Sequence, residues 1–166
     1  MGSNKISWTK QQAHVIDTRT GNLLVAAAAG SGKTAVLVER IIEMVLGVDS
    51  NGNKLPDQDR VNVDELLVVT FTNAAATQMK EKISAALQKK IDEYMANGIY
   101  DEHLIKQMTL INHAEICTID SFCLHIVKEY FAKVQLDSAF DIADKTEMEI
   151  IKKDVMDKVM ESCYQD

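Results

Sequence analysis

Apolar residues occur along this chain in two patterns, short continuous runs and longer stripes with helical spacing. The runs cover residues 23–27 and 66–71, and residues 115–119 are expected to form a third strand. Continuous apolar runs of this length are typical of strands buried in a parallel sheet. The stripes predict helices over the following segments: about 9–17, 33–46, about 74–97, about 102–111, from about 121 and from about 145. Strands that alternate with helices predict an α/β fold with a parallel sheet flanked by helices.

A loop of small residues joins the first run to the helix that follows it. The segment reads Ala27, Ala28, Ala29, Gly30, Ser31, Gly32, Lys33 and Thr34. A strand, a glycine loop, Lys-Thr and a helix in this order form the phosphate-binding loop, in which backbone N–H groups and the helix N-terminus attract a polyphosphate. Lys33 is expected to reach the β- and γ-phosphates and Thr34 to coordinate Mg²⁺. The sequence therefore predicts a nucleoside triphosphate site.

Ala27 departs from the general pattern of this loop, which has glycine at that position. An alanine at the end of a strand needs no positive φ, so we expect the loop to form all the same.

The composition is that of a soluble globular protein. The chain has 166 residues, of which 46% are hydrophobic and 26% charged, and its formal net charge is −7. No apolar run approaches the roughly 20 residues of a membrane span, and the N-terminus lacks the apolar core of a signal peptide, so we expect a cytoplasmic protein without membrane contact. The acidic balance excludes a surface that is basic all over, although it allows a local nucleic-acid groove.

Two further loops follow the second and third predicted strands. In a parallel sheet, binding loops lie at the carboxyl ends of the strands. They are residues 70–76 and residues 118–122, and both combine hydroxyl groups with a phenylalanine at the start of a helix. Such a loop suits the sugar–phosphate backbone of a single strand, with the ring available to stack on a base. Each loop taken singly fits an ordinary helix cap and a core phenylalanine equally well.

Taken together and in this order, four segments resemble the UvrD/Rep-type superfamily 1 DNA helicases. They are residues 8–12, similar to the glutamine motif, residues 27–34, similar to the phosphate loop, residues 70–75, similar to motif Ia, and residues 118–122, similar to the Thr-x-His-Ser-Phe motif. Within that family the match is closest to the A subunits of the AddAB-type helicase-nucleases. The resemblance extends over nearly the whole chain and implies a RecA-like fold that binds ATP and Mg²⁺.

The resemblance also implies roles for individual residues. Gln12 would read the adenine, and residues 27–34 would hold the phosphates, with Thr34 as the Mg²⁺ ligand. The residues implied at single-stranded DNA are Thr72, Asn73, Thr118 and Ser121, with Phe71 and Phe122 supporting the two loops. Asp120 stands where the family usually has histidine, which puts a carboxylate near the phosphate path and weakens that contact. The implied partners are DNA ends and a B subunit, in a heterodimer.

The acidic motif that would complete Mg²⁺ binding and activate water is not found, because no apolar run ends in an Asp-Glu pair. We therefore expect an N-terminal fragment, with most of the first RecA-like lobe in residues 1–140 and the start of an inserted helical subdomain in residues 141–166. The full-length protein would be an ATP-dependent helicase and exonuclease of double-strand break repair, whereas the fragment alone would bind ATP with little hydrolysis. The alternative is a kinase-like or nucleotide-binding module without DNA activity.

Overall fold

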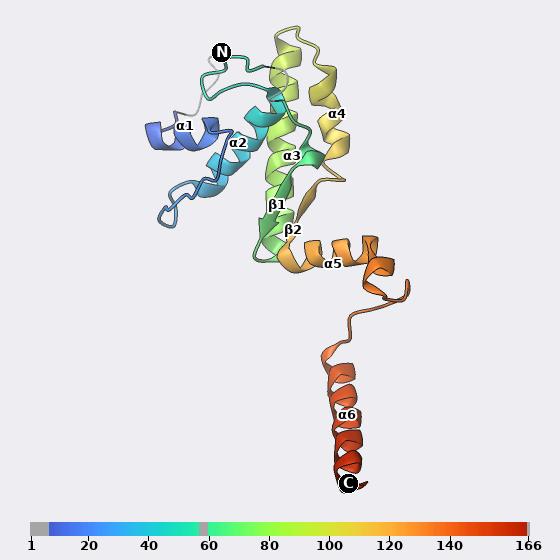
Figure 1. The fold of residues 1–166 in the computed structure, drawn as a ribbon. Helices are drawn as coiled ribbons and strands as arrows, with labels where there is room; N and C mark the ends of the chain where they lie inside the picture. The colour runs from blue at the N-terminus through green and yellow to red at the C-terminus, as the bar shows by residue number, and fades with distance from the viewer. Residues whose placement is uncertain (1–6, 57–59, 166) are drawn as a thin grey trace. The chain divides into compact units, whose positions relative to one another are not determined.

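A computed structural model describes residues 7–56 and 60–165 (Figure 1). The chain divides into two compact units between Cys123 and Leu124. In chain order the elements are α1 (Lys10–Asp17), α2 (Lys33–Leu46), the 3-10 helix η2 (Val63–Glu65), β1 (Leu67–Thr70), α3 (Asn73–Ala96), α4 (Glu102–Leu110), β2 (Glu115–Thr118), α5 (Ile119–Glu129), the 3-10 helix η3 (Phe131–Val134) and α6 (Lys145–Gln165). The helices expected from the apolar stripes are confirmed, with end residues that shift by one or two positions.

A two-stranded parallel sheet lies in the first unit. Leu67 is level with Glu115 and Thr70 with Thr118, and α3 and α4 make the crossover between the two strands. The α/β class with a parallel sheet flanked by helices is therefore confirmed. β1 is not covered on both faces as expected, because α3 packs on the sheet whereas Leu67 and Val69 remain about half exposed beside an open groove.

The strand expected over residues 23–27 is wrong, because the structure has no strand there. Leu23 and Val25 are partly exposed, and Leu24 is 96% exposed. A strand needs a neighbour that accepts and donates its backbone hydrogen bonds. Within the described residues β1 and β2 pair only with each other, so the segment has the composition of a buried strand but does not pair with the sheet.

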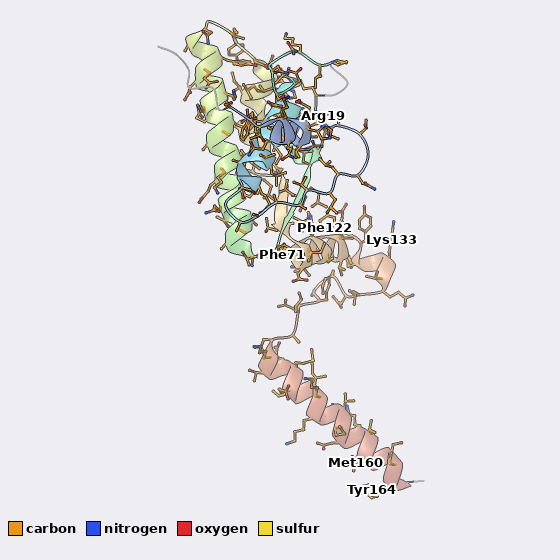
Figure 2. All side chains as sticks on the ribbon, turned by 90° about the vertical axis from the view of Figure 1, so that its left-hand side faces the viewer. Arg19, Phe71, Phe122, Lys133, Met160 and Tyr164 are labelled. Carbon is orange, nitrogen blue, oxygen red and sulfur yellow. The ribbon has the colours of Figure 1, made fainter. Side chains whose placement is uncertain are left out.

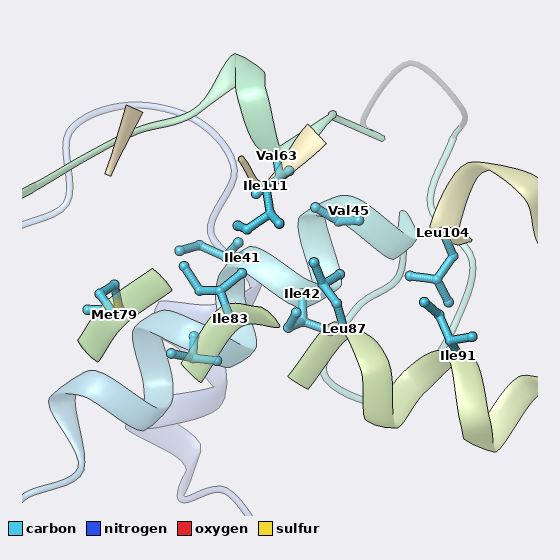
Figure 3. Close-up of a cluster of buried hydrophobic side chains, with 11 residues drawn as sticks. Ile41, Ile42, Val45, Val63, Met79, Ile83, Leu87, Ile91, Leu104 and Ile111 are labelled. Carbon is cyan, nitrogen blue, oxygen red and sulfur yellow. The ribbon is translucent and has the colours of Figure 1, made fainter. Parts of the chain in front are cut away.

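The core of the first unit lies between α2, α3 and α4 (Figure 3). Its fully buried side chains include Ile42 of α2, Ile83 and Leu87 of α3 and Leu104 of α4. The i+4 spacing of Met79, Ile83, Leu87 and Ile91 puts one apolar stripe of α3 against this core. Because α2 is anchored here, the phosphate loop at its N-terminus has a rigid base.

The second unit contains the long helix α6. The expected capping pair is confirmed, since the Asp144 N–H donates to Glu147 and the Glu147 N–H donates to Asp144, both at 2.9 Å. The apolar stripe of α6 keeps about half of its surface exposed, for example at Ile151 and Val155. No helix in the described part of the chain is long and apolar enough to cross a membrane.

Candidate nucleotide and nucleic-acid site

The loop between residues 27 and 33 has the backbone conformation of a phosphate cradle. Gly30 and Gly32 have φ values of +78° and +82°, a left-handed conformation in which a side chain would be strained. Gly32 is the N-cap of α2 and provides no side-chain cap, so the N–H groups of the first helical turn are free for an anion. Ala27 has no positive φ, as expected from its place before the turn.

Lys33 folds its side chain back over this loop. Its Nζ donates to the carbonyl oxygens of Ala27 at 2.8 Å and Ala28 at 2.7 Å. The Ser31 N–H also donates to the Ala28 carbonyl, at 3.3 Å, which tightens the turn. Lys33 is exposed, so its ammonium can exchange the carbonyl oxygens for phosphate oxygens, with which charge-assisted hydrogen bonds are stronger.

Gln12 lies beside the same loop, although 19 residues separate it from Ser31. Its Oε1 accepts from the Thr9 N–H at 2.9 Å, within the capping box of α1, and its Nε2 donates to the Ser31 carbonyl at 3.3 Å. The Gln12 carboxamide also lies close to the Gly32 backbone, because a Cβ at Gly32 would stand 3.6 Å from Nε2. The structure thus brings the proposed adenine reader and the proposed phosphate loop together.

A cavity of about 480 Å³ lies between α1, α2 and the segment before the loop. Its lining residues are Thr9, Gln11, Gln12, Val15, Val25, Ala26, Ala27, Ser31, Lys33, Val36, Leu37 and Arg40. Apolar walls with a few polar groups, at this size, are typical of small-molecule sites. Ala28, Ala29, Gly30, Gly32 and Thr34 lie next to the cavity in the chain and do not line it.

Arg40 is a member of the cavity wall that sequence reasoning missed. It comes seven residues after Lys33, and the available signal was this spacing of two helical turns, which puts both residues on one side of α2. The Arg40 side chain donates to the carbonyl oxygens of Val15 and Ile16 at the end of α1. Burial and the neighbouring Arg19 guanidinium lower the pKa of Arg40.

The two loops considered for DNA leave the sheet at the same edge, because Thr70 and Thr118 end β1 and β2 in register. Phe71 and Phe122 both lie at this edge (Figure 2). Phe71 is fully exposed, so its ring is free to stack and does not support the loop. Phe122 is partly buried.

The hydroxyl groups of these loops cap the helices that follow. Thr72 Oγ1 accepts from the Ala75 N–H at 3.1 Å. Thr118 Oγ1 accepts from the Ser121 N–H at 3.2 Å and lies 2.9 Å from the Ser121 hydroxyl. Asn73, the first residue of α3, is exposed. These hydroxyl groups therefore act as ordinary helix caps and also lie at a polar edge of the sheet, because a capping oxygen at a helix N-terminus can still face solvent.

No group of three or more His, Cys, Asp or Glu side chains able to hold a metal occurs among the described residues. Thr34 still fits the expected Mg²⁺ ion. Mg²⁺ in nucleotide sites usually keeps several waters and takes one or two protein ligands plus phosphate oxygens.

Comparison of the sequence with known proteins identifies a family. The family model described as the UvrD/REP helicase N-terminal domain matches residues 8–165. The chain belongs to the UvrD/Rep helicase family. A UvrD-type N-terminal domain is a RecA-like helicase lobe, in agreement with the parallel sheet and the glycine loop described above.

Three relatives are named as the A subunits of ATP-dependent helicase/nucleases. The chain is 48% identical over 162 residues to the one from Lachnoclostridium phytofermentans, which covers 98% of this chain and 11% of that protein. Identity is 47% over 159 residues with the one from Clostridioides difficile, covering 96% of this chain and 12% of that protein. It is 45% over 166 residues with the one from Clostridium beijerinckii, covering 100% and 12%. The chain thus spans about one eighth of the length of these relatives.

Proposed function

We propose that this chain is the ATP-binding part of a protein that unwinds and processes DNA ends in double-strand break repair by recombination. In this proposal residues 1–140 form most of the first RecA-like lobe, and residues 141–166 begin an inserted helical subdomain. The full-length protein would be an ATP-dependent helicase with exonuclease activity that pairs with a B subunit. Its family membership and its similarity to proteins named as helicase/nuclease A subunits support this.

The observation that carries the proposal is the contact between Gln12 and the phosphate loop. Gln12 Nε2 donates to the Ser31 carbonyl, and Lys33 Nζ lies over the same loop. One cavity therefore offers a carboxamide, which can pair with the edge of a base, and an ammonium group for phosphates. A site for a phosphate alone would need no carboxamide on a second helix.

Within this site each residue has one task. Lys33 and the N–H groups of the loop bind the β- and γ-phosphates, and the Thr34 hydroxyl binds Mg²⁺, which shields the phosphate charge. The edge made by Phe71, Thr72 and Asn73, with Thr118, Ser121 and Phe122 beside it, would grip a single strand.

The chain by itself is proposed to bind ATP with little hydrolysis. Activation of the attacking water takes a carboxylate or amide group near the γ-phosphate, and neither β1 nor β2 ends in a carboxylate, since both end in threonine. Asp120 comes two residues after the end of β2 and is the second residue of α5, at the edge proposed for DNA.

Titration of a fluorescent ATP analogue in the presence of Mg²⁺ tests the proposal. Lys33→Ala should weaken binding about ten- to a hundredfold, since hydrogen bonds to charged groups contribute about 1.5–3 kcal/mol each. Lys106→Ala is the matched control, because it removes a lysine charge from the exposed face of α4, outside the cavity lining.

Equal affinities of the parent and Lys33→Ala would contradict the proposed site. The rate of ATP hydrolysis per bound nucleotide should equal that of Lys33→Ala, and a rate well above it would contradict the claim of little hydrolysis. Binding of nucleotide without any binding of oligo-dT would favour the module without DNA activity.

A further inference from the structure

The helix that carries Gln12 is too short to hold its own position. α1 has eight residues, and isolated helices shorter than about 12 residues are marginal in water. Ile16 is its only buried residue. The placement of Gln12 in the cavity therefore depends on what holds α1 against α2, which is the packing of Ile16 and the polar contacts at the two ends of the helix.

The N-terminal end is tied to the phosphate loop by Gln12 itself. The capping box with Thr9 uses Oε1, and the bond to Ser31 uses one N–H of Nε2. A carboxamide has two lone pairs and two N–H groups, so one of each remains for a purine edge. This arrangement works only while α1 stays at its present distance from the loop.

The C-terminal end is held by Arg40. Its guanidinium donates to the carbonyl oxygens of Val15 and Ile16, which belong to the last turn of α1, where carbonyl groups lack helical partners. A cation at that end is also favoured by the helix dipole. Arg19 donates to the Ile16 carbonyl and, at 3.2 Å, to the Val48 carbonyl, and it does not line the cavity.

Arg40 and Lys33 belong to the same helix, with their Cα atoms about 10 Å apart along its axis at 1.5 Å per residue. α2 is fixed by its buried residues, among them Ile41 and Ile42. The phosphate end and the base end of the cavity are therefore both set by this one rigid element, the first through Lys33 and the second through Arg40 and α1.

We propose that Arg40 is a positioning residue for base recognition, which holds α1 so that Gln12 can discriminate adenine from other bases. This inference rests on the proposed ATP site and deepens it. Arg40 acts through α1 and Gln12, so its removal should change the choice of base and leave the grip on the phosphates intact.

The test compares Arg40→Gln and Arg40→Lys with the parent chain. Competition of ATP and of GTP against a fluorescent nucleotide gives the ratio of their dissociation constants. Arg40→Gln should lower the preference for ATP about three- to tenfold, the range of one net hydrogen bond. Arg40→Lys should retain part of the preference, because an ammonium can still donate to one of the two carbonyl oxygens. The affinity for tripolyphosphate should not change.

Arg60→Gln is the matched control. Arg60 also donates to a carbonyl oxygen near a helix C-terminus, that of Val45 at 3.0 Å, and it pairs with Asp101 at 2.7 Å, but it does not line the cavity. Its loss should lower stability without changing the preference for ATP.

A double-mutant cycle decides whether Arg40 acts through Gln12. In a Gln12→Ala background Arg40→Gln should have no further effect on the ratio of ATP to GTP affinity. Independent effects of the two substitutions, an unchanged ratio in Arg40→Gln, or an equal loss with Arg60→Gln would overturn the inference.

A second readout needs no nucleotide and keeps this inference separate from the proposed function. Amide hydrogen exchange in the free chain should show loss of protection in residues 13–17 in Arg40→Gln, with α2 unchanged. Retained protection of α1 would overturn the role of Arg40, whereas a parent chain that binds no ATP would overturn the proposed function instead.

Discussion

The carboxyl group of Glu43 is buried with few groups nearby that stabilise its negative charge. Replacing it with a neutral side chain should therefore stabilise the protein at neutral and basic pH. Its side chain is on α2 and only 5% of the residue is exposed. Its Oε2 has no hydrogen-bond partner within the described structure. Burial, reinforced by the charges of Glu39, Asp17 and Asp49 and opposed by Arg19, raises the pKa of Glu43 to about 7.

The sign and size of the effect follow from this pKa. The ordinary value is 4.5, so the folded protein holds the Glu43 proton more tightly than the unfolded chain does, and stability falls as the pH rises from about 4.5 to about 7. With 1.36 kcal/mol per pKa unit, the loss is at most about 3 kcal/mol once the pH exceeds 7. Near pH 5 less than about 1 kcal/mol of it has developed.

Urea unfolding of the parent and Glu43→Gln at pH 5 and pH 8 measures this difference. Glutamine keeps the shape of the protonated acid, so we expect the variant to gain up to about 3 kcal/mol over the parent at pH 8 and much less at pH 5. Glu81→Gln, on the exposed face of α3, is the control and should show no such gap between the two pH values. If the difference in free energy of unfolding between Glu43→Gln and the parent is the same at both pH values, or grows as the pH falls, the reasoning is refuted.

Two further predictions concern the core and the DNA edge. Gln107 is fully buried and its Oε1 accepts from the Val63 N–H at 2.9 Å, so Gln107→Leu should cost about 1–3 kcal/mol in urea unfolding by leaving that donor unpaired; a neutral result would mean that another acceptor takes its place. Asp120→His removes a negative charge beside the proposed phosphate path, so fluorescence polarisation should show tighter binding of oligo-dT; unchanged affinity would place Asp120 away from the strand.

Elements with a complete local signal could be predicted from the sequence. α2 begins after Gly32 and ends before Gly47, both in the left-handed conformation, and Ile41, Ile42 and Val45 face one core. Thr9 and Thr72 cap helices as their positions suggest. In each case the residues that decide the structure lie within one or two turns of each other.

The failures share a different physical cause, because they depend on groups far away in the chain. Residues 23–27 have the right composition for a strand, but a strand exists only through hydrogen bonds to a neighbour, and composition does not say whether that neighbour is present. The same holds for the face of β1 that carries Leu67 and Val69, and for the apolar stripe of α6. A pattern of apolar residues predicts that a surface will be buried, but it does not identify the element that buries it.

In the nucleotide site, the glycine loop could be predicted from the sequence, whereas the cavity beside it could not. The glycine loop is a local backbone conformation, so eight consecutive residues specify it. The cavity beside it needs α1 and α2 to meet, and the groups that join them, Arg40 with Val15 and Gln12 with Ser31, are 25 and 19 residues apart. Motif reading found Gln12 through a resemblance and missed Arg40, which bonds to backbone carbonyl oxygens. Such an arginine belongs to no motif of its own, because any residue can supply the carbonyl that it binds. The spacing of seven residues puts Arg40 on the side of α2 that carries Lys33, but its bonds to α1 become visible only when both helices are placed.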